Sequence, residues 1–237
     1  MRLDNQVAII TGGTGGLGLA VVKAFLQDGA QVVAPYRSHS KLEGLLSHLG
    51  DLKGRLTSLQ ADVTQRESVT ALVAKTLEQF GKTDILINIV GGFAGGTSVA
   101  ETDEEAWDNM MSLNLKSAFL CCRAVVPHMV ERGRGKIISV SSRAALKGGA
   151  RVSAYSASKA GVIILTESLA EEVKDSNINV NAILPSVIDT EANRQARPKA
   201  DFSRWVKPEE IAQVMLFLVS EEARALNGAA IPVYGRV

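Results

Sequence analysis

The chain has 237 residues, enough for one large α/β domain with a substantial core. Its 26 lysines and arginines balance 25 aspartates and glutamates, and the interspersed charges give no support for binding to nucleic acid or to a membrane surface. No apolar run approaches the roughly 18 residues of a membrane span, and the N-terminus carries no secretory apolar segment.

Apolar runs of strand type alternate with amphipathic runs of helix type along the whole chain. The pattern predicts strands at 7–10, 31–34, 55–60, 84–89, 136–140, 178–184 and 229–233. It predicts helices at 16–28, 41–49, 66–80, 104–132, 154–174 and 208–220, of which the long one, 104–132, is expected to be interrupted or kinked at Pro127. The stretch 189–206 is expected to be a loop or a mobile flap.

The predicted strands are near-continuous apolar runs, which is typical of a parallel sheet covered on both faces. Repeated βα units predict an α/β fold with a doubly wound parallel sheet of about seven strands and helices on both faces. No linker or repeat divides the chain, so we expect one domain over residues 1–237.

A glycine-rich turn, Thr-Gly-Gly-Thr-Gly-Gly-Leu-Gly at 11–18, lies between the first predicted strand and the first predicted helix. Free backbone N–H groups and the helix dipole make such a turn an anion site, and glycine lets the backbone approach a pyrophosphate closely. Gly13, Gly15 and Gly18 match G-x-G-x-x-G, while no Lys-Ser/Thr pair follows, which argues against an ATPase or GTPase. The turn therefore predicts a dinucleotide site.

Tyr155 and Lys159 are four residues apart at the start of a predicted helix and therefore share one helix face. A lysine ammonium beside the phenol is expected to lower the tyrosine pKa. A tyrosine tuned in this way exchanges a proton with a carbonyl or alcohol oxygen near neutral pH.

With both motifs present in order, nearly the whole chain resembles the short-chain dehydrogenase/reductase family of NAD(P)-dependent Rossmann enzymes. The resemblance implies four catalytic residues, Asn114, Ser142, Tyr155 and Lys159. It implies cofactor contacts at Thr11, Gly12, Thr14, Gly16, Leu17, Gly18, Tyr36, Arg37, Asp62, Val63, Asn88, Gly91, Tyr155, Lys159, Pro185, Ile188 and Thr190.

Two motifs depart from the family pattern. Asn88-Ile89-Val90-Gly91 stands where the family has Asn-Asn-Ala-Gly, which predicts an altered adenosine side with the cofactor still bound. Ser186 replaces the glycine of the usual Pro-Gly and is expected to reshape the nicotinamide wall.

The resemblance implies hydride transfer between a nicotinamide and a carbonyl or alcohol carbon, with 3-oxoacyl compounds or small ketones as the expected substrates. Tyr155 would be the general acid or base, Ser142 would hold the substrate oxygen, and Lys159 would also hold the nicotinamide ribose. Asn114 would position a water that relays the proton.

Two alternatives stay open. The segment 189–205 is similar to the corresponding stretch of dihydropteridine reductases, which suggests a pterin or quinonoid reductase, although those enzymes generally lack the serine at position 142. A non-catalytic dinucleotide-binding regulator would need only the glycine turn.

The end of the second predicted strand indicates the cofactor. Tyr36 occupies the place of the acidic residue that binds the ribose 2′-hydroxyl in NAD-dependent enzymes, and Arg37, which follows, can pair with a 2′-phosphate. We therefore expect NADP(H) to be preferred, with NAD(H) still possible as a cofactor.

The remaining expectations concern the substrate pocket, the oligomeric state, the cysteines and a metal site. Substrate walls are expected from the C-terminal loops and from 92–97, 143–152 and 186–205. Apolar residues on several faces of the two long helices, including Phe119 and Ile164, predict a homotetramer, with a dimer as the smaller alternative. The adjacent Cys121 and Cys122 are expected to be buried thiols in a cytoplasmic protein, and the histidine spacing indicates no metal site.

Overall fold

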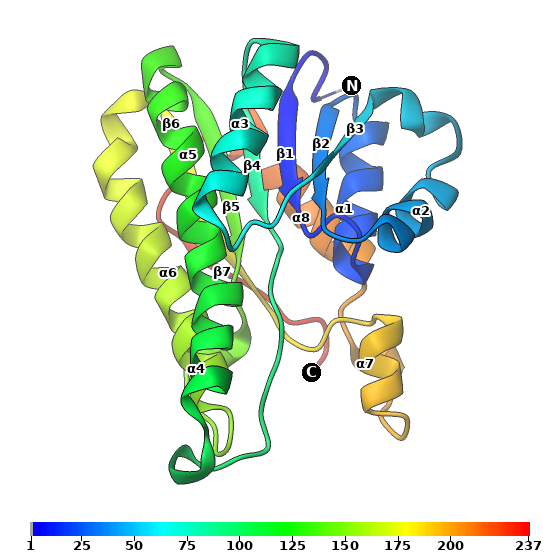
Figure 1. Ribbon diagram of the computed structural model, residues 1–237, viewed down its shortest axis with the longest axis vertical. Coiled ribbons are helices and arrows are strands. Elements are labelled where there is room, and N and C mark those ends of the chain that lie inside the picture. Colours follow the sequence, from blue (N-terminus) through cyan, green and yellow to red (C-terminus); the bar gives the residue numbers. More distant parts are fainter. Residues whose placement is uncertain (1) are drawn as a thin grey trace.

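The structure, a computed structural model, describes residues 2–237. Seven parallel strands form one sheet in the order β3-β2-β1-β4-β5-β6-β7 (Figure 1). The strands are β1 (Val7–Thr11), β2 (Gln31–Tyr36), β3 (Leu56–Gln60), β4 (Ile85–Asn88), β5 (Gly135–Val140), β6 (Ile178–Pro185) and β7 (Ala230–Val233). The strand order reverses between β1 and β4, and an open α/β sheet binds its ligands in the crevice at such a point.

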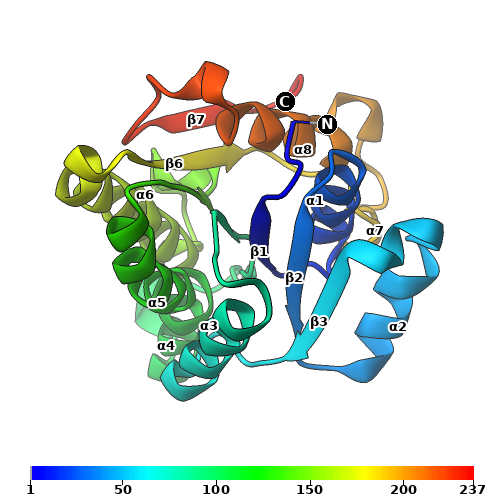
Figure 2. The ribbon, with the colours of Figure 1, turned by 90° about the horizontal axis from the view of Figure 1, so that it is seen from above.

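Helices cover both faces of the sheet. The α-helices are α1 (Gly16–Gln27), α2 (His39–Ser47), α3 (Arg66–Phe80), α4 (Glu104–Met110), α5 (Ser117–Arg132), α6 (Ser153–Val173), α7 (Glu191–Ala196) and α8 (Pro208–Leu218). Seen from above, α3, α4, α5 and α6 gather on one side, while α1 and α8 lie together on the other (Figure 2). The predicted doubly wound fold is therefore confirmed.

The continuous apolar strands follow from this double cover. Side chains alternate between the two faces of a strand. Ala8 and Ile10 of β1 therefore belong to the core shared with α1 and α8, while Val7 and Ile9 belong to the core shared with α3, α5 and α6. All five residues of β1 are buried, so the strand lacks the alternation of apolar and polar residues that a solvent-exposed face would produce.

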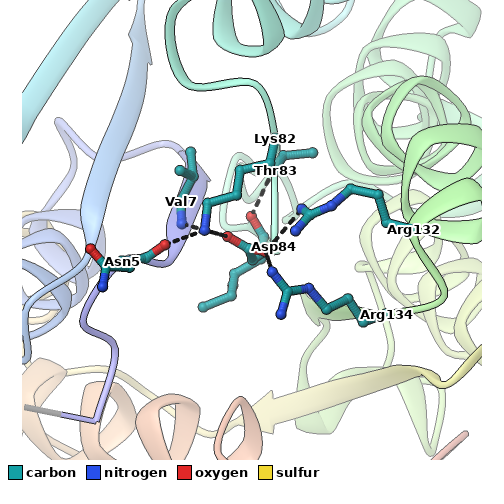
Figure 3. Close-up of polar contacts among 8 residues, drawn as sticks. Asn5, Val7, Lys82, Thr83, Asp84, Arg132 and Arg134 are labelled. Atoms are coloured by element: carbon teal, nitrogen blue, oxygen red, sulfur yellow. Dashed lines mark hydrogen bonds and ion pairs between the residues drawn. The ribbon is translucent and has the colours of Figure 1, made fainter.

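A buried carboxylate stabilises the end of the sheet at which the strands begin, opposite the glycine turn. One oxygen of Asp84 contacts Arg132 at 3.0 Å and Arg134 at 3.3 Å, and the other contacts Lys82 at 3.3 Å and accepts from the backbone N–H of Val7 at 2.9 Å (Figure 3). A buried charge needs such partners. The cluster joins the starts of β1 and β4 to the end of α5.

The predicted helix 104–132 is interrupted, but not where proline was expected to interrupt it. Helix α5 runs through Pro127, between the buried Val125 and Met129, whose packing holds the helix together around the missing N–H. The break falls at a π-helical turn, Met111–Lys116, between α4 and α5. Such turns are frequent at functional sites.

The stretch 189–206 is more ordered than a loop. Thr190 caps α7 by accepting a hydrogen bond from the N–H of Asn193 at 3.3 Å, and Arg194 grips Asp189 through two hydrogen bonds of 2.5 and 2.8 Å. The short helix α7 lies beyond the same end of the strands as α4 (Figure 1). Together, these elements flank the carboxyl ends of the strands.

Candidate active site

A cleft of about 720 Å³ opens at the carboxyl ends of the strands. Its volume falls in the range typical of cofactor and substrate sites. Fifteen of the residues predicted from the sequence line it: Gly12, Thr14, Gly16, Leu17, Gly18, Tyr36, Arg37, Asp62, Val63, Gly91, Ser142, Tyr155, Lys159, Pro185 and Ile188.

The glycine turn is packed so tightly that its glycines cannot be replaced freely. Gly12 has a φ of +71°, which favours glycine. A β-carbon added at Gly18 would stand 2.0 Å from the carbonyl oxygen of Gly12, whereas one added at Gly15 would meet that oxygen at 3.4 Å. Gly18 therefore lets the first turn of α1 close against the strand end, so that free N–H groups face the cleft.

Thr11 lies behind this turn and does not line the cleft. Its hydroxyl donates to the carbonyl of Ile87 at 3.4 Å and accepts from the N–H of Ile89 at 3.1 Å. It thus ties the glycine turn to the end of β4. Asn88 is also buried behind the cleft wall, where its amide donates to the hydroxyl of Ser139 at 3.2 Å.

One end of the cleft is basic. Arg37 follows β2, and its guanidinium lies 3.9 Å from the carboxylate of Asp62. Burial raises the pKa of Asp62, but hydrogen bonds from Thr64 and the charge of Arg37 outweigh burial, so the net pKa is lowered. Lys41 lines the same end, although no sequence motif predicted it. The helix was predicted to begin at 41, whereas α2 begins at His39, which places Lys41 in its first turn.

The other end holds Ser142, Tyr155 and Lys159. Ser142 caps a 3-10 turn by accepting from the N–H of Ala144 at 3.2 Å. The neighbouring Ser141 donates its hydroxyl to the carbonyl of Lys159 at 2.7 Å and so joins the end of β5 to α6. The hydroxyl of Ser142 instead forms a hydrogen bond with Tyr155. The Tyr155 ring meets that of Phe93 edge-on, with centroids 5.0 Å apart.

The pKa values differ from the sequence-based expectation. Burial raises the pKa of Tyr155 above its usual value of 10.0, and a hydrogen bond with Ser142 lowers it only in part. Lys159 is fully buried, and burial lowers its own pKa to about 8. The expectation that Lys159 lowers the pKa of Tyr155 is therefore wrong for this structure, because the loss of water around the phenolate dominates.

Asn114 lies in the π-helical turn, behind the end of the cleft that holds Tyr155 and Lys159, and is almost fully buried. Its side-chain oxygen accepts from the N–H of Gly92 at 2.8 Å, and its amide donates to the hydroxyl of Ser158 at 3.0 Å. A β-carbon at Gly91 would stand 2.7 Å from the Asn114 oxygen and 3.0 Å from the Lys159 ammonium. Gly91 thus permits both polar groups to approach the same backbone position.

Thr190, the remaining predicted contact, lies against the glycine turn without lining the cleft. A β-carbon at Gly16 would meet its methyl group at 2.9 Å. Arg197, just after α7, lies within the stretch 186–205 from which a substrate wall was expected, and it lines the cleft. The chain's own groups fit a dinucleotide: a glycine cradle at the centre, basic residues at one end and hydroxyl groups at the other.

Comparison with known proteins agrees with this geometry. The sequence profile of the family described as short chain dehydrogenase matches residues 6–201. The 3-oxoacyl-acyl-carrier-protein reductase FabG of Thermotoga maritima is 35% identical over 243 residues, which cover 99% of this chain and 98% of that protein.

Two solved structures are similarly close. A variant of actinorhodin polyketide ketoreductase with NADPH has a TM-score of 0.90 and 29% identity, with 97% of this chain and 96% of that chain covered. ElxO with NADP bound has a TM-score of 0.91 and 26% identity, with 97% of each chain covered.

The chain belongs to the short-chain dehydrogenase/reductase family. It is an oxidoreductase that acts on CH–OH or C=O groups, and the family binds nicotinamide dinucleotides. Within residues 2–237, no group of three or more His, Cys, Asp or Glu side chains is placed to hold a metal ion. Over the same residues, no helix combines the length and apolarity that crossing a membrane requires.

Proposed function

We propose that this protein is an NADP(H)-dependent reductase of 3-oxoacyl compounds or small ketones, formed by a single domain over residues 1–237, with Tyr155 as the general acid. The observation that carries the proposal is the convergence of Ser142, Tyr155 and Lys159 in the cleft that also contains the glycine turn. A regulator that only bound a dinucleotide would not need the three side chains. The FabG relative and the ketoreductase, by their names, act on substrates of the proposed class.

The bound nicotinamide would supply the hydride. The Tyr155 hydroxyl would give its proton to the carbonyl oxygen, and its raised pKa keeps that proton in place at neutral pH. The Ser142 hydroxyl would donate a second hydrogen bond to the same oxygen and stabilise its developing negative charge.

Lys159 would act from behind Tyr155. Its ammonium donates to the carbonyl of Val140 at 2.9 Å and faces the backbone at Gly91. We propose that it holds the nicotinamide ribose. Asn114, whose side-chain oxygen lies beside the same position of Gly91, would complete a path for the proton through water.

NADP(H) is favoured by the charges at the far end of the cleft. Arg37 and Lys41 both line that end, and two basic side chains suit the dianionic 2′-phosphate of NADP(H) better than a ribose hydroxyl. Arg37 is largely exposed and its contact with Asp62, at 3.9 Å, is long. It can therefore turn to a phosphate without breaking a buried ion pair.

We further propose assembly as a homotetramer, with a dimer as the smaller alternative. Phe119 of α5 and Ile164 of α6 are 44% and 60% exposed, beside an apolar groove that Leu115 and Leu165 line. A second copy would cover this face. Light scattering tests it: Phe119→Glu should reduce the mass of the particle, and a wild-type protein that is monomeric at all concentrations would exclude assembly.

A substrate panel with NADPH tests the function. A 3-oxoacyl thioester and a simple ketone should be reduced faster than a quinonoid dihydropterin. Faster turnover of the dihydropterin would favour the pterin-reductase alternative. Binding of NADPH without turnover of any carbonyl or alcohol would favour the regulator.

A further inference from the structure

Arg143 occupies an unusual place for an exposed arginine, next to a catalytic hydroxyl. It follows Ser142 directly and begins the 3-10 turn Arg143–Ala145, and both residues line the cleft. Consecutive α-carbons are about 3.8 Å apart. Arg143 therefore lines the same cleft in which Ser142 and Tyr155 would hold a carbonyl group.

The guanidinium is held in position by the C-terminal segment. Its Nη1 donates to the main-chain oxygen of Val237 at 2.8 Å, and its central carbon lies 5.6 Å from the ring centroid of Tyr234. The Tyr234 carbonyl in turn accepts from the hydroxyl of Ser186, on the cleft wall, at 2.6 Å. Within residues 2–237, Arg143 makes no ion pair with an aspartate or glutamate side chain, so most of its N–H donors remain for a ligand.

The side chains that line the cleft at this end do not repel an anion. Among the described residues that line the cleft, the only acidic side chain is Asp62, which lies at the opposite end beside Arg37. Ala144, which follows Arg143 and also lines the cleft, is apolar, and Phe93 lines the cleft against the ring of Tyr155. A charge-assisted hydrogen bond gains strength when apolar groups exclude water around it.

We infer that Arg143 binds a carboxylate-type anion on the substrate, so that the preferred substrates are ketones that carry a negative charge a few bonds from the carbonyl. The inference rests on the proposed reductase function and narrows its substrate class. The planar fork of an arginine suits a carboxylate, which it holds through two parallel hydrogen bonds. Held there, the anion would align the carbonyl oxygen with Ser142 and Tyr155.

The test compares a charged ketone with its neutral ester, acetoacetate with ethyl acetoacetate, at saturating NADPH. The wild-type protein should show the higher kcat/KM with acetoacetate. Arg143→Gln should lower the ratio of the two kcat/KM values by about tenfold or more, mainly through KM for acetoacetate, in line with the loss of one charge-assisted contact. Arg143→Lys, which keeps the charge but not the fork, should fall between.

The matched control is Lys147→Gln, which removes an exposed positive charge four residues away that does not line the cleft. It should leave the ratio unchanged. Butyrate, which cannot be reduced, should inhibit the wild-type reduction of ethyl acetoacetate competitively, and butyramide should not. This inhibition test uses only the wild-type protein, so its result does not depend on whether a variant folds.

The outcomes separate the two proposals. If the wild-type protein reduces ethyl acetoacetate but does not prefer acetoacetate, or if Arg143→Gln leaves the ratio unchanged, the role of Arg143 is overturned while the reductase function stands. If neither ketone nor any thioester is reduced, the reductase function fails and the inference fails with it.

Discussion

The ammonium of Lys159 donates a hydrogen bond of 2.9 Å to the carbonyl oxygen of Val140, the last residue of β5. Val140 stands two residues before Ser142, and Lys159 lies one helical turn after Tyr155. This single contact therefore joins the strand that leads to Ser142 to the helix that carries Tyr155. It also places a positive charge where the protein interior disfavours it.

Replacing that lysine should change how stability depends on pH. Burial lowers the pKa of Lys159 from 10.5 to about 8. Between these values the unfolded chain holds the proton and the folded protein has released it, so the wild-type protein gains stability as pH rises, by up to about 1.4 kcal/mol per unit. Lys159→Met lacks this gain. Its free energy of unfolding relative to the wild type should be greatest near pH 7 and should decline toward pH 10.

Urea unfolding of both proteins at pH 7, 8, 9 and 9.5, without cofactor, measures this difference. The variant loses the hydrogen bond to Val140, which lowers its stability by a similar amount at every pH. A difference that stays constant from pH 7 to 9.5 would show that Lys159 keeps an ordinary pKa.

Tyr155→Phe should lower kcat by about 10²-fold or more, the scale of general acid–base catalysis. The ring and its edge-on contact with Phe93 remain, so the dissociation constant for NADPH should hardly change. Ser156→Ala is the matched control, because the neighbouring Ser156 hydroxyl is buried and has no hydrogen-bond partner among the described residues. Near-native turnover by Tyr155→Phe would remove Tyr155 from the mechanism.

The two reaction directions should respond differently to pH. Burial raises the pKa of Tyr155, so its neutral acid form persists throughout pH 6–9. Over pH 6–7, where Lys159 with its pKa of about 8 also keeps its proton, the rate of reduction should be flat. Oxidation of the alcohol needs the phenolate, and its kcat/KM should rise about tenfold per unit from pH 7 to 9. A reduction rate that falls tenfold per unit from pH 6 to 7 would mean that the pKa of Tyr155 is lowered after all.

The sequence predicted the framework of the site because that framework is set by local patterns. Strand periodicity, the glycine turn and the four-residue spacing of Tyr155 and Lys159 depend on neighbours in the chain. The cleft accordingly brings together the glycine turn, Ser142 and this pair as expected.

Other properties depend on groups that are far apart in the sequence. The direction of the Tyr155 pKa follows from how deeply the folded chain buries the ring, which a spacing rule does not contain. Helix α5 continues through Pro127, where the buried neighbours Val125 and Met129 pack against the core. The position of Lys41 depended on where α2 begins, and helix boundaries are the least certain part of a pattern.

Gly18→Ala should destabilise the protein, because the added methyl would stand 2.0 Å from the Gly12 carbonyl oxygen and the turn would have to move. Overpacking of this kind costs about 1–3 kcal/mol. Gly15→Ala is the control, since its methyl would meet the same oxygen at 3.4 Å and its φ of −90° suits alanine. Thermal unfolding without cofactor should show a lower Tm for the first variant only, and equal values would mean that the turn is not closely packed.

Cofactor preference should reside in Arg37 and Lys41. Arg37→Ala removes a charge-assisted contact worth about 1.5–3 kcal/mol, so KM for NADPH should rise about tenfold or more, while KM for NADH should hardly change. Adding Lys41→Ala should weaken NADPH further, because both side chains line the same end of the cleft. The control is Lys53→Ala, which removes an exposed charge outside the cleft. Equal use of NADH and NADPH by the wild-type protein would contradict the preference, and an equal loss of both cofactors in Arg37→Ala would assign that residue to the shared adenosine part instead.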